Sequence, residues 1–146
     1  MNWGESSGET PLEEKDIHNA KSQSQPEVLT FFPQVPEDDF KLARKAVEFS
    51  NHKGGTIFIG ISGEGKFTGV GDPSEVEVEV GVLLEDRIEG DFRYHTFTYD
   101  IDGCGIIEVR IKTYETLPCS VDGKFYKWKP VPRPLSPREV RELMLD

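Results

Sequence analysis

The stretch Asn51–Asp72, NHKGGTIFIGISGEGKFTGVGD, decides the fold of this chain. It places seven glycines around two short apolar runs, and Glu64 is its one acidic residue before the final aspartate. A glycine pair after an amphipathic segment is typical of a helix end, and the β-branched run TIFIGIS then predicts a buried strand. The GEG segment predicts a hairpin turn that leads into a second strand, KFTGV.

Segments on both sides of this stretch extend the pattern. Apolar residues recur at helical spacing in EDDFKLARKAVEFS, while Lys41, Arg44, Lys45 and Glu48 are expected to face away from that stripe. Other segments predict a first strand EVLTFF, a hairpin that turns at Asp102-Gly103, a short strand GKFYKWK, and a final helix with Ser136 as N-cap and Pro137 at its first position.

Residues 73–90 give two readings. The run SEVEVEVGV alternates acid and valine with period two, which is typical of a strand with one wet face. The preceding Asp72-Pro73-Ser74-Glu75 is typical of a helix start, and Val76, Val80 and Ile88 also lie at helical spacing. Both alternatives stay open at this point.

Together these elements predict an α+β fold, a mixed and mostly antiparallel sheet with helices packed on it, in the order β-α-β-β-α-β-β-β-α. The length of 146 residues fits one such domain, expected over residues 27–146. Residues 1–26 are rich in Ser, Glu, Gln, Gly and Asn and poor in periodic apolar residues, so we expect a flexible acidic leader.

The composition limits the classes of function. No apolar run approaches the roughly 20 residues that a membrane span needs, so we expect no membrane partner and an intracellular location, cytoplasmic or nuclear. The net charge is −10, from 17 basic and 27 acidic side chains. Because this charge repels polyanions, any nucleic-acid site has to be a local basic patch.

With these elements in place, the chain resembles the divergent Alba-type domain of the Schlafen superfamily over Glu27 to Asp146. The residues that carry the resemblance are Phe49, Asn51, Gly54-Gly55, the TIFIGIS strand, the glycine turn, Gly69-Val70, Pro118, and Tyr126 shortly before PLSPREVRELM. The resemblance implies an α/β nucleic-acid-binding domain that in some members is a metal-dependent ribonuclease, and partnership with another Schlafen-like chain in homo- or hetero-oligomers.

The acids of those nucleases are missing from their expected positions. The resemblance implies a Leu-Glu-Phe-Lys motif on the first strand, where this chain has Leu29-Thr30-Phe31-Phe32, and an aspartate after the second strand, where it has Ser62. Hard cations bind mainly to anionic oxygens. We therefore expect no catalytic residue, no metal and no cofactor, with relocated acids at Glu27, Glu64 or Asp100 as the alternative.

The segment GKFYKWKPVPR carries the stronger signal for binding. Lysines neutralise phosphates and aromatic rings stack on bases. The candidate nucleic-acid-binding residues are Lys53, Lys66, Lys127, Trp128, Lys129 and Arg133. They predict binding of RNA more than DNA, without cleavage. A second hypothesis is a protein-interaction subunit of a Schlafen-like nuclease complex, docking through the acidic, valine-rich segment.

Overall fold

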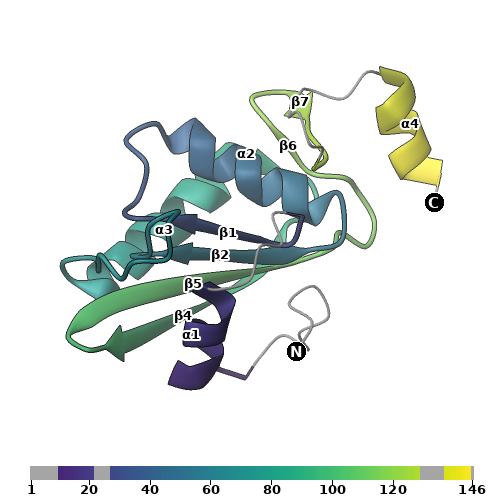
Figure 1. The fold of residues 1–146 in the computed structure, drawn as a ribbon. Helices are drawn as coiled ribbons and strands as arrows, with labels where there is room; N and C mark the ends of the chain where they lie inside the picture. The colour runs from purple at the N-terminus through teal and green to yellow at the C-terminus, as the bar shows by residue number, and fades with distance from the viewer. Residues whose placement is uncertain (1–9, 22–26, 129–136, 146) are drawn as a thin grey trace.

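The computed structural model of the chain describes residues 10–21, 27–128 and 137–145. Its centre is a four-stranded mixed sheet with strand order β1-β2-β5-β4, in which β1 and β2 run parallel and the other neighbours are antiparallel (Figure 1). The strands are β1 (Leu29–Phe32), β2 (Gly55–Ile59), β4 (Arg93–Ile101) and β5 (Cys104–Lys112). This confirms the predicted α+β class and the hairpin that turns at Asp102-Gly103.

Helices cover both faces of this sheet (Figure 1). On one face, α2 (Asp39–Ser50) and α3 (Pro73–Arg87) enclose the larger apolar core with β2 and β5. On the other face, α1 (Glu14–Lys21) encloses a smaller core with β1, β2 and β5. Every residue of β2 is buried, because the strand is central and covered on both sides.

The expected flexible leader is wrong for the part that forms α1. Ile17 and Ala20 of this helix are fully buried against the sheet. They lie three positions apart, so one helix face carries both, and two small apolar contacts were too short a signal for the periodicity to register. The domain therefore begins before Glu27, the boundary that the sequence suggested.

The ambiguous segment 73–90 is a helix over most of its length. The Asp72 side chain caps α3, accepting hydrogen bonds from the backbone N–H groups of Ser74 (3.1 Å) and Glu75 (3.3 Å), and Pro73 opens the first turn. Val80 is buried at helical spacing from Leu83 and Leu84, whereas Val78 and Val82 are exposed. Capping and tertiary packing thus prevail over the period-two alternation.

The second strand expected in KFTGV does not form. Only isolated bridges join Ile61 to Phe67 and Val70 to Gly105. The N–H groups of Thr68 and Gly69 both donate to the carbonyl of Gly60, so the chain curls back at that point. Such a shared acceptor cannot continue the alternating ladder of a strand pair.

Two glycines of the deciding stretch are required by close packing. A Cβ at Gly55 would lie 2.8 Å from the ring of Phe49, and one at Gly60 would lie 2.7 Å from the carbonyl oxygen of Gly105. Gly60 also has φ +104°, which other residues rarely adopt. The glycines therefore serve to bring helix, strand and hairpin together.

A small second sheet extends from the main domain. It has the order β3-β6-β7 and consists of β3 (Ile88–Glu89), β6 (Ser120–Val121) and β7 (Lys124–Phe125). The last strand predicted from GKFYKWK is confirmed at β7, and the final helix α4 (Pro137–Leu145) begins at Pro137 as predicted. The proposed N-cap Ser136 lies outside the described residues. The observed order thus adds α1, β3 and β6 to the predicted one and lacks the strand predicted in KFTGV.

All helices within the described ranges are too short or too polar to cross a lipid bilayer.

Candidate nucleic-acid interface

The end of α2 anchors the segment that leads to Trp128. The buried Asn51 side chain donates from Nδ2 to the carbonyls of Cys119 (2.8 Å) and Tyr126 (2.7 Å), and its Oδ1 accepts from the N–H of Cys119 (2.8 Å). The N–H of Trp128 donates to the carbonyl of Glu48 at 3.3 Å. Residues 126–128 therefore lie alongside the last turn of α2.

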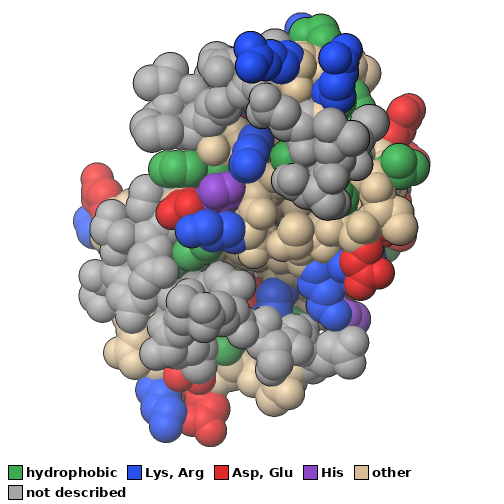
Figure 2. All heavy atoms as spheres, turned by 90° about the vertical axis from the view of Figure 1, so that its right-hand side faces the viewer, with side chains coloured by type: hydrophobic (Ala, Val, Ile, Leu, Met, Phe, Trp, Pro, Cys, Tyr) green, Lys and Arg blue, Asp and Glu red, His purple; other side chains and the backbone are tan. Residues whose placement is uncertain are grey.

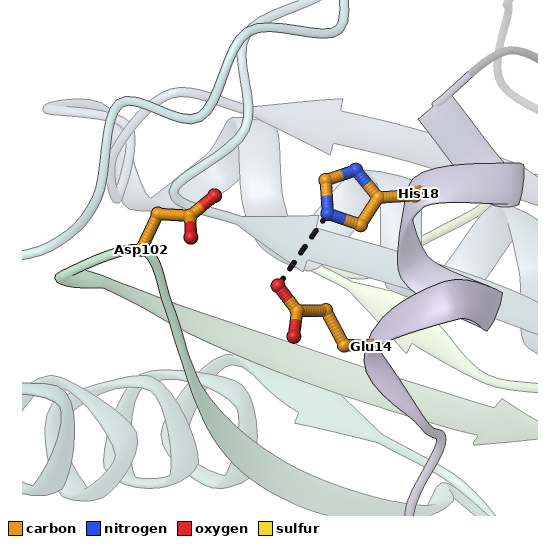
Figure 3. Close-up of side chains that lie close together, drawn as sticks. All are labelled: Glu14, His18 and Asp102. Atoms are coloured by element: carbon orange, nitrogen blue, oxygen red, sulfur yellow. Dashed lines mark ion pairs between the residues drawn. The ribbon is translucent and has the colours of Figure 1, made fainter.

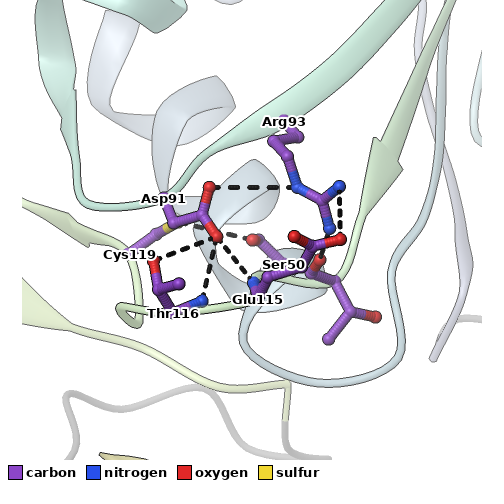
Figure 4. Close-up of polar contacts among 7 residues, drawn as sticks. Ser50, Asp91, Arg93, Glu115, Thr116 and Cys119 are labelled. Atoms are coloured by element: carbon purple, nitrogen blue, oxygen red, sulfur yellow. Dashed lines mark hydrogen bonds and ion pairs between the residues drawn. The ribbon is translucent and has the colours of Figure 1, made fainter.

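Asp91 fixes the loop at residues 115–116, which precedes this segment in the chain (Figure 4). One carboxylate oxygen of Asp91 accepts hydrogen bonds from the N–H groups of Glu115 (2.7 Å) and Thr116 (3.0 Å). These two hydrogen bonds lower the pKa of Asp91, and Arg93 acts in the same direction. Ser50 contacts the thiol of Cys119, and burial raises the pKa of that thiol.

Four side chains meet at the amino-terminal edge of the parallel pair β1 and β2. Glu27 precedes β1, and His52 and Lys53 precede β2. The Glu27 carboxylate contacts Nε2 of His52 and lies 3.0 Å from Nζ of Lys53. The His52 ring stacks on Trp128, with centroids 6.0 Å apart and planes 25° from parallel. We call these four residues the edge cluster.

Electrostatics favour an ionised acid within the edge cluster. Hydrogen bonds from His52 and then Lys53 lower the pKa of Glu27. The molecular face that lies on the right of Figure 1 shows basic side chains on either side of a histidine and an acidic side chain (Figure 2). Lys53 keeps 60% of its side chain exposed, so it can reach a ligand despite its contact with Glu27.

Glu48 was expected to lie on the outward face of α2, and this prediction is wrong. Its side chain is fully buried, 3.1 Å from Nε of Arg44 and 3.2 Å from Nζ of Lys45. The Arg44 contact is an ion pair without hydrogen-bond geometry, since neither atom has a hydrogen-bond partner. Arg44 and Lys45 are therefore both paired with the buried Glu48. Lys53 is the more accessible cation.

The structure unites some of the predicted binding residues and separates others. Glu27 contacts both Lys53 and His52, the His52 ring stacks on Trp128, and Lys127 is half-buried next to Trp128 in the chain. Tyr126 is buried in the core, edge-on to Phe40. Lys66 lies in the 62–66 turn beyond the opposite end of β2, so it does not join the others. Lys129 and Arg133 lie outside the described residues.

The two positions at which the resemblance implies acids carry neutral hydroxyl side chains, and the three alternative acids do not converge on one site. The hydroxyl of Ser62 accepts from the N–H of Lys66 at 3.1 Å, and Thr30 faces the α2 side of the sheet together with Phe32. Across the described part of the chain, the group of potential metal ligands that converges is Glu14, His18 and Asp102, which lies elsewhere. The alternative acids Glu27, Glu64 and Asp100 do not take part in it.

The sequence reasoning missed Glu27 and His52 as members of one cluster. They are 25 positions apart, with an entire helix between them. One signal was present: a strand, a helix and a parallel strand place the starts of both strands at the same edge of a sheet. Residues directly before each strand could therefore have been expected to meet.

A groove adjoins the small sheet. It has a volume of about 370 Å³ and is lined by Gly123, Lys124, Phe125, Pro137 and Val140, between β7 and α4. Its walls are partly apolar, and the exposed Lys124 stands at its rim.

Solved structures share this architecture. The DIP2311 protein from Corynebacterium diphtheriae aligns with a TM-score of 0.63 and 16% identity, over 88% of this chain and 27% of DIP2311. The N-terminal domain of an ATP-dependent DNA helicase RecG-related protein from Nitrosomonas europaea aligns with a TM-score of 0.53 and 14% identity, over 81% and 90% of the two chains. At these identities the likeness shows the fold. This chain thus corresponds to only a part of DIP2311.

Sequence comparison decides the family. Among curated proteins, none matches the chain. The sequence model described as "Schlafen, AlbA_2" matches residues 12–129, which include α1 and every described strand. The resemblance drawn from the glycine-rich stretch is therefore confirmed, and the chain belongs to the Schlafen AlbA_2 family.

Proposed function

We propose that this domain binds nucleic acid, RNA more than DNA, at the edge cluster and the adjoining Lys127, and that it does so without cleaving it. The observation that carries the proposal is the meeting of Lys53, His52 and Trp128 at one edge of the sheet. A cation beside a partly exposed aromatic ring is the combination that sequence-tolerant single-strand binders use. The family supports nucleic-acid binding in general terms.

Each side chain has a distinct part in this proposal. Lys53 and Lys127 neutralise backbone phosphates and release counterions. Trp128 offers its ring to a base, while His52 supports the ring from one side. The overall charge of −10 opposes binding at long range, so affinity depends on these few contacts and falls steeply with salt.

The donor set supports the proposed binding without cleavage. Hydrolysis of a phosphodiester by metal ions needs carboxylates that hold the cation and position it against the phosphate. Thr30 and Ser62 supply neutral hydroxyls, and Ser62 is already engaged with the backbone of its own turn. The edge cluster supplies a single carboxylate, Glu27, which His52 and Lys53 already contact.

Charge reversal at the edge tests the site. The double variant Lys53→Glu and Lys127→Glu is expected to weaken binding of a single-stranded RNA by about 10- to 100-fold, because two phosphate contacts become repulsive. Fluorescence anisotropy with a labelled 15-nucleotide RNA at fixed salt measures the change.

The matched control carries the same charge change elsewhere. Lys41 lies in the first turn of α2 and Lys66 in the distant turn, and both are exposed. The variant Lys41→Glu and Lys66→Glu is expected to lose no more than about threefold. Equal losses in both double variants would show a general charge effect and contradict a site at the edge cluster.

A substitution at Glu27 distinguishes an RNA-binding site from a nuclease site. The variant Glu27→Gln is expected to strengthen RNA binding by up to about fivefold, since it frees Lys53 from a competing carboxylate. Binding and cleavage are measured on the same RNA with added magnesium or manganese. Cleavage by the unaltered chain that disappears in Glu27→Gln would instead establish a nuclease with relocated acids.

The outer face of α3 supports a second candidate function, the binding of a protein partner. The outer face of α3 exposes Val78 (65%) and Val82 (54%) one turn apart. Exposed acids surround them, at Glu75, Glu79, Glu85 and Asp86. An apolar strip within an acidic rim fits a partner segment with apolar anchors and basic flanks. This face and the edge cluster belong to different elements, so the two roles are compatible.

A further inference from the structure

Three side chains of types that can bind metal ions converge on the α1 side of the sheet (Figure 3). Glu14 and His18 come from α1, and Asp102 comes from the turn between β4 and β5. One ligand atom of each lies within 4.8 Å of the others, and all three residues are exposed. The contributing elements are more than 80 positions apart in the chain, so folding is needed to create the group.

Local structure aims these side chains at one point. Glu14 and His18 are four positions apart, so they lie on the same helix face. The His18 ring packs edge-on against Phe67, with centroids 5.0 Å apart and planes at 88°, and this contact restrains its orientation. Asp102 occupies the left-handed position of the hairpin turn with φ 52°, and Figure 3 shows its carboxylate directed toward the other two.

We propose that Glu14, His18 and Asp102 bind one divalent transition-metal ion, such as zinc, and that this ion links α1 to the β4–β5 turn. An imidazole nitrogen with two carboxylate oxygens is a donor set that suits zinc more than magnesium or calcium. Two carboxylates at this separation repel each other, and a dication removes that repulsion. This site is separate from the edge cluster and independent of the proposed nucleic-acid binding.

The distances suit such an ion. Nε2 of His18 and Oε1 of Glu14 are 3.5 Å apart. Ligands about 2.0–2.2 Å from a tetrahedral ion are separated by about 3.4 Å, so this pair needs almost no movement. Asp102 closes the remaining gap through rotation of an exposed side chain. Three protein ligands leave a fourth position for water.

The ion would strengthen a helix that has few other anchors. With eight residues, α1 is too short to be stable alone, and its buried contacts centre on Ile17 and Ala20. A ligand set that spans α1 and the hairpin adds binding free energy only in the folded arrangement. The rate of hydrogen exchange at the α1 amides is therefore a second readout, besides uptake of the ion.

Zinc titration of the full chain tests the proposal. Calorimetry is expected to show one zinc ion per chain, and His18→Ala or Glu14→Gln is expected to weaken binding by at least about tenfold, because one of three ligands is lost. Glu13→Gln is the matched control, since Glu13 is an exposed neighbour that pairs with Lys15 outside the group. Zinc should also slow hydrogen exchange of the α1 amides in the unaltered chain and in Glu13→Gln, but not in His18→Ala.

Other outcomes would overturn the proposal. No zinc uptake would reduce the group to the polar contact between His18 and Glu14. Uptake that survives both His18→Ala and Glu14→Gln would place the ion elsewhere. Uptake that is lost in Cys104→Ser and kept in Glu14→Gln would assign it to the nearby thiol.

Discussion

Replacing Arg110 by alanine is expected to lower the free energy of unfolding by about 3–5 kcal/mol. Arg110 and Glu108 lie two positions apart on the same side of β5, and 4% and 0% of these residues are exposed. Nε and Nη2 of Arg110 donate to the two carboxylate oxygens at 2.9 and 3.0 Å. Without the guanidinium, the Glu108 carboxylate would stay buried with no compensating charge.

The surroundings of this pair increase the cost of breaking it. The hydroxyl of Tyr99 donates to Glu108 at 2.6 Å, and burial together with this carboxylate raises the pKa of Tyr99. Arg110 also donates to the carbonyl of Thr10 at 3.0 Å, and the N–H of Leu12 donates to the Tyr99 hydroxyl at 2.9 Å. Losing Arg110 therefore also releases the segment that precedes α1.

Urea denaturation followed by circular dichroism measures this effect. The control is the double variant Glu108→Leu and Arg110→Met, which replaces both charges by apolar groups of similar length. It is expected to recover most of the loss, because a buried pair contributes little net stability relative to well-packed apolar residues. A loss below about 1 kcal/mol for Arg110→Ala would show that Glu108 finds water or another partner.

Replacing Asn51 by alanine is expected to cost about 2–4 kcal/mol of unfolding free energy. The side chain satisfies the N–H and carbonyl of Cys119 and the carbonyl of Tyr126, all within the interior. Alanine removes all three of these hydrogen bonds. The same change frees residues 126–128, so RNA affinity should fall as well.

The variant Asn51→Asp distinguishes hydrogen bonding from size. An aspartate keeps the shape and can accept from the N–H of Cys119, but it points a carboxylate oxygen at two carbonyls. It is therefore expected to destabilise at least as much as alanine, with recovery at acidic pH, where the protonated acid can donate one hydrogen bond. Thermal unfolding at pH 7 and pH 4 measures both variants. Equal stability of Asn51→Asp and the unaltered chain at pH 7 would contradict the assigned orientation of the amide.

The sequence predicted most of the elements that have strong local signals. α2 ended at Ser50, a few residues before the left-handed Gly54, the run from Gly55 formed β2, and Asp102-Gly103 turned the long hairpin. In each case local propensity and tertiary packing agree, so a pattern over a few residues was sufficient. The ambiguous α3 needed tertiary information, because its caps and its alternation favoured different structures.

Three of the missed features share one physical cause. Ile17 and Ala20 anchor α1 with two small contacts, so the leader looked unstructured. Without that helix and the segment before it, nothing predicted that Glu108 and Arg110 would be buried on the outer side of β5. The group of Glu14, His18 and Asp102 was missed for the same reason, since it depends on where α1 docks.

The candidate site was predicted only in part. The residues Lys53, Lys127 and Trp128 stood out as cations and an aromatic ring, but charge alone could not tell that Lys66 lies beyond the far end of β2. The contribution of Glu27 and His52 came from the topology of the parallel strand pair. Residue type therefore predicts the kind of site, and strand order decides its members.

The salt dependence of RNA binding decides whether Lys53 and Lys127 contact backbone phosphates. The logarithm of the association constant is plotted against the logarithm of the salt concentration for the unaltered chain and for the variant Lys53→Gln and Lys127→Gln. The slope is expected to be shallower by about 1.4 in the variant, since each single-strand phosphate contact contributes about 0.7. Identical slopes, or no measurable binding by the unaltered chain at low salt, would contradict a nucleic-acid interface at the edge cluster.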